Sequence, residues 1–259
     1  MRFEVYLDTS RKSGRVMAHV LEPPGLGIRF ESRASFEREM GGAISEHLRW
    51  LASHGLWESP PPQNGSVEWA IAEEQPIEGD FESGDDVGFY GPDLAPLSRD
   101  EVERYLQIAR CAREGLVALV RRLPPEAFDW RYNEKARPIR QILRHVANAE
   151  LWYITRVIDD PSKHGMPPEL DALDRRMDAS SDPVERLLMV REGFERFFRM
   201  APDEVLNQVT TPSWFCEILT ERWTARKALR RAIEHEREHT RSILWTLASH
   251  GFDLSAFGG

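Results

Sequence analysis

The hydrophobic residues in the N-terminal part of the chain change their spacing twice. Residues 2–8 alternate between apolar and polar side chains, which predicts a half-buried strand. Two more strands are predicted at residues 15–21 and 28–30, because turns containing glycine or proline separate these short runs. Apolar residues then recur at helical spacing over 34–55, and strand alternation returns at 67–72. The pattern predicts a small β-β-β-α-β unit.

Four long amphipathic helices are predicted in the rest of the chain. Apolar residues recur at helical spacing over 98–123, 138–158, 183–200 and 224–251. Helices that each bury one apolar face are typical of a four-helix bundle. The connections of about 20 residues on either side of the third helix are long enough for crossovers or a lid.

Charge and composition divide the chain at the same place. The 259 residues are 41% hydrophobic and carry a net charge of −9, which is ordinary for a soluble globular protein. Residues 1–97 hold 8 Lys and Arg against 17 Asp and Glu, whereas residues 98–259 hold 26 of each. Residues 78–97 are rich in Gly, Pro and Asp, which indicates an acidic linker. We therefore predict an α+β two-domain chain, with a small domain at 1–77 and a four-helix domain at 98–259.

The distribution of charged and apolar residues disfavours nucleic acids and membranes as partners. Neither half has the basic excess that an extended nucleic-acid interface requires. Arg226, Lys227, Arg230 and Arg231 are interpreted as a solvated helix face, with Glu234 as an i+4 partner. There is no signal core, and no apolar run approaches the roughly 20 residues needed to cross a bilayer. We expect a cytoplasmic protein without nucleic-acid or membrane partners.

Two histidines in the last predicted helix have the spacing of metal ligands. His235 and His239 are four residues apart, so their imidazoles share one helix face. The same string matches the HExxH pattern of zinc peptidases. However, the residue six positions after His239 is Trp245, and Asp253 is the only acid left downstream. We therefore expect the third ligand from upstream, and His145, beside the apolar face of the second predicted bundle helix, is the candidate.

Three histidine ligands would leave one coordination position open, which is the arrangement of catalytic zinc sites. A lone histidine on an apolar face is usually a hydrogen-bonded core residue, but three such histidines are costly to bury without a shared partner. We predict a divalent metal ion, with zinc as the first choice and nickel or iron as alternatives. Glu150 and Glu238 are the candidate catalytic groups for proton transfer, whereas Glu236 is interpreted as a partner of surface arginines.

Residues 139–156 and 223–243 resemble the DinB-like superfamily, four-helix proteins related to bacterial thiol S-transferases and mycothiol-dependent isomerases. The matching features are a single histidine on the second helix and a His-x-x-x-His on the fourth. By this resemblance, which covers roughly residues 98–250, His145, His235 and His239 are the metal triad. The resemblance implies a divalent metal that activates a low-molecular-weight thiol for transfer to a small-molecule electrophile.

Residues 1–77 resemble the HicB-like domain family in the hairpin followed by Glu22-Pro23-Pro24-Gly25 and in the end of the following helix. The chain departs from that family at Leu26, where a cysteine is usual, so no antitoxin or RNA-related role is transferred. A competing hypothesis is a non-catalytic, metal-stabilised binding module whose N-terminal domain recognises a partner. A homodimer is left open as the assembly state.

Overall fold

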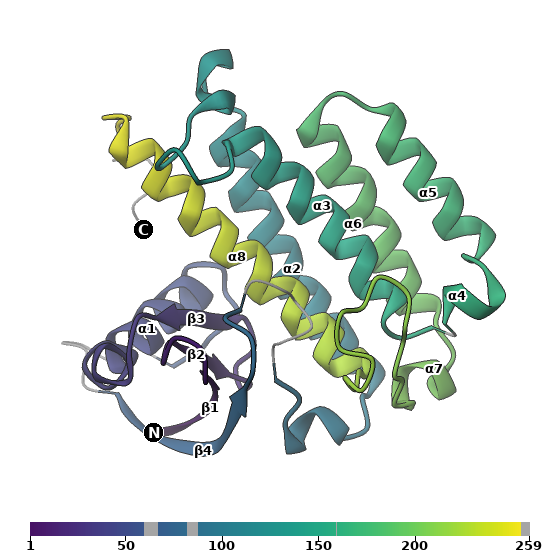
Figure 1. Cartoon of the computed structure of the whole chain (residues 1–259), viewed down its shortest axis with the longest axis horizontal. Helices are drawn as coiled ribbons and strands as arrows, with labels where there is room; N and C mark the ends of the chain where they lie inside the picture. Colours follow the sequence, from purple (N-terminus) through teal and green to yellow (C-terminus); the bar gives the residue numbers. More distant parts are fainter. Residues whose placement is uncertain (60–66, 82–87, 159, 255–259) are drawn as a thin grey trace.

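A four-stranded sheet lies beside a helical bundle in the computed structural model, which describes residues 1–59, 67–81, 88–158 and 160–254 (Figure 1). The strands are β1 (Arg2–Ser10), β2 (Val16–Val20), β3 (Leu26–Phe30) and β4 (Glu68–Ile77). Their order in the sheet is β3-β2-β1-β4. β1 is antiparallel to β2 and parallel to β4. The parallel pair is possible because helix α1 (Arg33–Ser53), which follows β3 in the sequence, returns the chain before β4 begins. The predicted order β-β-β-α-β is present.

One face of the sheet packs against α1. The helix begins at Ser32, whose side chain accepts a hydrogen bond from the amide of Ser35. Apolar residues from the strands and from α1 form one core cluster, which includes Phe3, Val5, Leu7, Val20, Phe36, Met40, Ile44 and Leu48. The period-2 pattern of β1 and the helical pattern of α1 meet in this core, which is why both elements were predictable from the sequence.

The predicted bundle helices are α2 (Arg99–Val120), α3 (Ile139–Thr155), α6 (Pro183–Met200) and α8 (Ala225–Ser249). α2 and α3 each contact both α6 and α8, so the four helices surround a common core. α8 begins after Thr224, whose hydroxyl accepts a hydrogen bond from the amide of Lys227. Among the described residues, none of the helices has the length and apolarity needed to span a bilayer.

The long connections between the bundle helices contain short helices that the sequence did not predict. These are α4 (Pro161–His164), α5 (Pro168–Ala179) and α7 (Asp203–Asn207). α5 packs on α6, on the side of the bundle away from the sheet (Figure 1). The two helices approach closely at Gly193, where a Cβ atom would lie 2.4 Å from Cδ2 of Leu173. α5 is short and presents few apolar residues, which explains why its pattern was missed.

The other face of the sheet packs on α8, and the interpretation of the basic cluster as a solvated face is wrong. Lys227, Arg230 and Arg231 are 0%, 1% and 2% exposed. Each has an acidic partner: Lys227 pairs with Glu221, Arg231 pairs with Glu234, and the carboxylate of Asp93 pairs with Arg230 at 2.7 Å. Because partners such as Asp93 are remote in sequence, a local charge pattern could not reveal this burial. Arg226, by contrast, remains partly exposed.

The residues after the sheet are joined to both parts of the molecule. The amide of Gly88 donates to Asp8 of β1 at 2.9 Å, and its carbonyl accepts from Arg230 of α8 at 3.1 Å. The short 3-10 helix η3 (Gly91–Leu94) carries Asp93, the partner of Arg230. Residues 82–87 of the predicted linker lie outside the described residues. The division into domains at residues 77 and 98 stays a prediction.

A buried ion-pair network centred on Glu234 connects the sheet to α8. His19 of β2 lies between Asp8 and Glu234, with Nδ1 2.9 Å from Glu234 and Nε2 3.4 Å from Asp8. Arg231 donates to the same Glu234 oxygen at 2.6 Å. Burial opposes the charge of Glu234, but His19 and Arg230 outweigh burial and lower the pKa of this carboxyl below its usual range. Glu234 is therefore ionised in the folded chain.

We expect the Glu234→Gln variant to lose about 2 kcal/mol of unfolding free energy at pH 7, because a charged hydrogen-bond acceptor is removed. A carboxyl with a lowered folded-state pKa stabilises the fold above its unfolded pKa, near 4.5, and this stabilisation is lost as pH falls. The deficit of the variant should therefore shrink below pH 4.5. Urea unfolding of both proteins at pH 7 and pH 3.5 measures it. A deficit of equal size at both pH values would contradict this prediction.

Candidate metal centre

Three histidines converge between α3 and α8. α3 positions His145, and α8 positions His235 and His239 one turn apart. Nε2 of His235 lies 3.1 Å from Nε2 of His145 and 3.1 Å from Nε2 of His239. One ligand atom from each ring lies within 4.8 Å of the other two. The structure therefore brings together the three residues that were predicted as metal ligands.

The spacing of these nitrogens fits a single metal ion. Zinc–nitrogen bonds are about 2.0 to 2.1 Å long, so two nitrogens on one ion lie about 3.0 to 3.4 Å apart at common coordination angles. A neutral imidazole has one donor and one acceptor nitrogen, so three facing Nε2 atoms cannot all pair well by hydrogen bonds. An ion between them would accept all three lone pairs. The donor set suits zinc, nickel and iron.

Burial keeps the three imidazoles neutral at pH 7. It lowers the pKa of His145 to about 4, with a further contribution from His239. The pKa of His239 falls to about 3, first by burial and then by the positive charges of Arg29, Arg137 and Arg231. The pKa of His235 also lies well below its usual value because of burial. Since a metal binds neutral imidazole, protons compete only weakly for this centre at neutral pH.

The histidines line an open pocket of about 860 Å³. That volume is within the usual range for small-molecule sites, about 300 to 1,000 Å³. α3 contributes Trp152 and Tyr153, and the segment before α8 contributes Trp214 and Phe215. Phe215 has a positive φ of 45° and is 77% exposed, so it stands at the solvent side of this aromatic wall. A small molecule can therefore reach the histidine nitrogens.

The sequence did not indicate that residues of the N-terminal part line this pocket. Arg29 of β3 and Phe81, which follows β4, both line it, and the guanidinium carbon of Arg29 lies 6.0 Å from the Phe81 ring centre. β3 reaches the pocket because it packs on α8. The polar contacts between β3 and α8 include Arg241, which donates to the carbonyl of Gly27 at 2.7 Å.

The two predicted catalytic carboxylates have different surroundings. Glu238 lines the histidine pocket and pairs with Arg29, whose Nε lies 2.9 Å from Oε1 of Glu238. Its other oxygen, Oε2, is buried and has no hydrogen-bond partner among the described residues. Glu150 instead lies behind the centre, in a narrow gap shared with His235, and both Arg113 and Arg191 bind it. The structure therefore brings Glu238, and not Glu150, to the main pocket.

The interpretation of Glu236 as a partner of surface arginines is wrong. Glu236 is 1% exposed and belongs to a buried cluster with Glu150, Arg113 and Arg191. Its oxygens lie 2.6 Å from Arg113 and 2.5 Å from Arg191. Both arginines come from other helices, α2 and α6, so the cluster joins four helices directly behind His235. The partners of Glu236 were not identifiable from its neighbours on α8.

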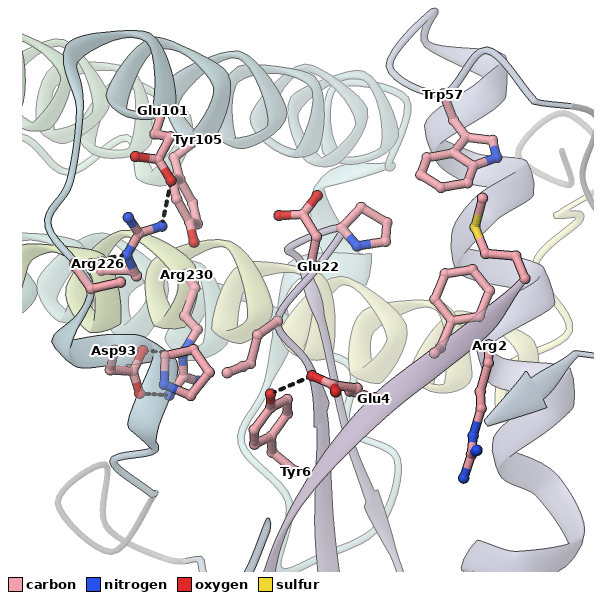
Figure 2. A pocket seen from close by; sticks show the side chains of 16 residues that line it. Arg2, Glu4, Tyr6, Glu22, Trp57, Asp93, Glu101, Tyr105, Arg226 and Arg230 are labelled. Atoms are coloured by element: carbon pink, nitrogen blue, oxygen red, sulfur yellow. Dashed lines mark hydrogen bonds and ion pairs between the residues drawn. The ribbon is translucent and has the colours of Figure 1, made fainter. Parts of the chain in front are cut away.

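A second pocket, of about 570 Å³, lies between the sheet and the first turns of α8 (Figure 2). Most of its polar groups are paired with one another. Tyr6 donates to Glu4 at 2.9 Å, and Arg226 lies 2.8 Å from Glu101. Figure 2 also shows the ion pair between Asp93 and Arg230, which both line the pocket. Because these charges already have partners, this pocket is a weaker candidate for a site of chemistry than the histidine pocket.

The fold and the site define a class of protein: a helical bundle that presents three histidines from two helices to an open pocket. Residues 109–243 match the family model of the DinB superfamily. The match spans more than half of the chain, and the chain belongs to this superfamily. The resemblance predicted from the two histidine-bearing segments is confirmed.

Comparison with solved structures finds YfiT from Bacillus subtilis, described as "a probable metal-dependent hydrolase with an unusual four-helix bundle topology". The two proteins share 16% sequence identity, with a TM-score of 0.46. The similarity covers 64% of this chain and 97% of YfiT. A comparison with curated proteins finds no match.

Proposed function

We propose that this chain is a metal-dependent enzyme acting on a small molecule. In this proposal His145, His235 and His239 hold a divalent ion that activates a low-molecular-weight thiol, or alternatively water, for attack on an electrophile. The observation that carries the proposal is the convergence of three Nε2 atoms in the wall of an open pocket of about 860 Å³. Among the described residues, the cluster of ligand atoms contains these three histidines and no fourth side chain.

The histidines would hold the ion, and the ion would lower the pKa of a thiol or water so that the nucleophile forms near neutral pH. Zinc is the first choice, with nickel and iron as alternatives. Glu238 lines the same pocket as the histidines, so in this proposal its carboxylate would accept the proton that the nucleophile loses. The nucleophile would then form a bond to the electrophilic carbon, and the leaving group would depart with its electron pair.

Other residues of the pocket would orient the substrate. The rings of Trp152, Trp214 and Phe215 provide an apolar wall for the carbon skeleton. Burial raises the pKa of Tyr153 to about 12, so its hydroxyl stays protonated at neutral pH and remains a hydrogen-bond donor. Glu150 is assigned a supporting role, because its carboxylate is held between Arg113 and Arg191.

The competing hypothesis of a metal-stabilised binding module finds less support. That hypothesis assigned the N-terminal part to the recognition of a partner. One face of the sheet is covered by α1, and residues of the other face, such as His19, are buried against α8. The accessible pocket beside the histidines also favours catalysis over a closed structural site.

We expect the purified protein to form a covalent adduct between a thiol and an alkyl halide or epoxide faster than the uncatalysed reaction, and only in the presence of metal. Mass spectrometry of the products across a panel of thiols measures this activity. The His145→Ala variant should lose it, whereas His250→Ala, at the end of α8, should retain it. A metal-loaded protein that turns over neither thiol nor hydrolysable substrates would contradict the proposed function.

A further inference from the structure

Three guanidinium groups line the histidine pocket, and they come from three separate parts of the chain. Arg29 belongs to β3, Arg137 precedes α3, and Arg231 lies on α8 one turn before His235. All three are close enough to His239 to act on it electrostatically. Three acids of the same pocket balance these charges, so a divalent ion among the neutral imidazoles would give the inner part of the pocket a net positive charge.

The hydrogen-bonding capacity of two of these groups is unfilled. Arg231 is 2% exposed, and its Nη1 donates to Glu234 at 2.6 Å, but its Nε has no acceptor among the described residues. Arg29 lies 2.9 Å from Glu238, yet its Nε also lacks an aligned acceptor within the described part of the chain. The unused donor of Arg231 is costly, because the Nε of this buried guanidinium has lost water without gaining a partner.

We propose that Arg29 and Arg231 bind a carboxylate group of the substrate, so that the N-terminal sheet provides part of the specificity of the metal-centred site. This inference rests on the proposed function, since it concerns the same pocket. The planar guanidinium group presents paired donors that match the two oxygens of a carboxylate. Through Arg29, the sheet becomes part of the substrate site.

The charge balance of the pocket favours a singly charged anion. Three acids, Asp174, Glu217 and Glu238, line the pocket together with the three arginines. A carboxylate adds one negative charge to this balance, whereas a doubly charged phosphate adds two and is repelled more strongly by the three acids. The aromatic wall lies in the same pocket and suits an apolar group attached to the carboxylate.

A matched control variant is available on the same interface. Arg241 of α8 donates to the carbonyl of Gly27, which lies two residues before Arg29 on β3. Arg241 does not line the histidine pocket. Arg241→Gln therefore disturbs the contact between the sheet and α8 without removing a pocket guanidinium. Arg29→Gln removes the guanidinium itself. Arg29→Lys keeps the charge but loses the planar pair of donors.

The probes are 2-naphthoate and 2-naphthamide, which have nearly the same shape and differ in charge. Isothermal titration calorimetry of the purified full-length protein measures both affinities. We expect naphthoate to bind at least about tenfold more tightly than naphthamide, since hydrogen bonds to charged groups are the stronger ones. Arg29→Gln should reduce this ratio to about threefold or less, Arg29→Lys should restore part of it, and Arg241→Gln should leave it unchanged.

Equal affinity for the two probes would overturn the inference. So would a preference that survives Arg29→Gln, because a carboxylate bound directly to the ion would give that result. An equal loss in Arg29→Gln and Arg241→Gln would also overturn it, since it would indicate a disturbed interface. If the Arg29-dependent preference is found in a protein that binds no metal and forms no adduct, the carboxylate site stands and the proposed function fails.

Discussion

Replacing His235 with alanine is expected to lower the affinity of the chain for zinc or cobalt by more than about 100-fold. Loss of a residue that only supports a metal ligand typically lowers metal affinity 10- to 100-fold. His235 is itself a candidate ligand, and its Nε2 is the central nitrogen of the cluster. Its Nε2 lies 3.1 Å from both other histidine nitrogens, so its removal leaves two donors without a common neighbour. Elemental analysis of the purified protein and calorimetric titration with metal measure the effect.

The control for this experiment is His250→Ala. His250 is the C-cap of α8 and stacks on Trp130, with ring centres 4.7 Å apart, far along the helix from the centre. That variant should bind metal as the original protein does. Full metal stoichiometry in His235→Ala, or equal losses in the two variants, would show that the three histidines do not form the site.

Replacing Glu236 with alanine is expected to lower the unfolding free energy by about 3 to 5 kcal/mol. Removal of one member of a buried ion cluster leaves an uncompensated charge. Arg113 and Arg191 each pair with both Glu236 and Glu150, so without Glu236 the two arginines would share the single carboxylate of Glu150. Arg113 also donates to the carbonyl of Leu187, so a rearrangement would disturb the contact between α2 and α6. Urea unfolding followed by circular dichroism measures the change.

An exposed ion pair provides the comparison. Asp171 and Arg175 on α5 are paired at 2.5 Å, with side chains 41% and 78% exposed. Asp171→Ala should cost less than about 1 kcal/mol, because solvent screens an exposed pair. If Glu236→Ala is no more destabilising than Asp171→Ala, the buried cluster does not stabilise the bundle in the way its burial implies.

Local patterns were sufficient to predict the main helices and the pair of histidines on α8. The i, i+4 spacing of His235 and His239 places two imidazoles together on any helix, whatever surrounds it. The partner His145 was inferred from its place beside an apolar face and from the resemblance to the DinB-like superfamily. The structure places it with Nε2 3.1 Å from His235. Short elements such as α5, which have few apolar residues, gave too weak a pattern to recognise.

Charged residues were the main source of error, for one physical reason. A helix sequence shows which side chains are basic or acidic, but burial depends on whether opposite charges from elsewhere cover them. The burial of Arg230 is compensated by Asp93, which lies 137 positions earlier in the chain. The burial of Glu236 is compensated by one arginine from α2 and one from α6. No spacing rule within α8 contains this information.

The order of strands and helices, the ends of the bundle helices and the pair of histidines on α8 follow from short-range periodicity and capping, which act within a few residues. The pocket does not follow from them. Its walls contain Arg29 of the sheet, aromatic residues from α3 and from the segment before α8, and Glu238 of α8. Arg29 and Glu238 form an ion pair between the sheet and α8. These groups meet because β3 packs on α8, and that packing joins segments far apart in the sequence, such as Gly27 and Arg241, which are 214 positions apart.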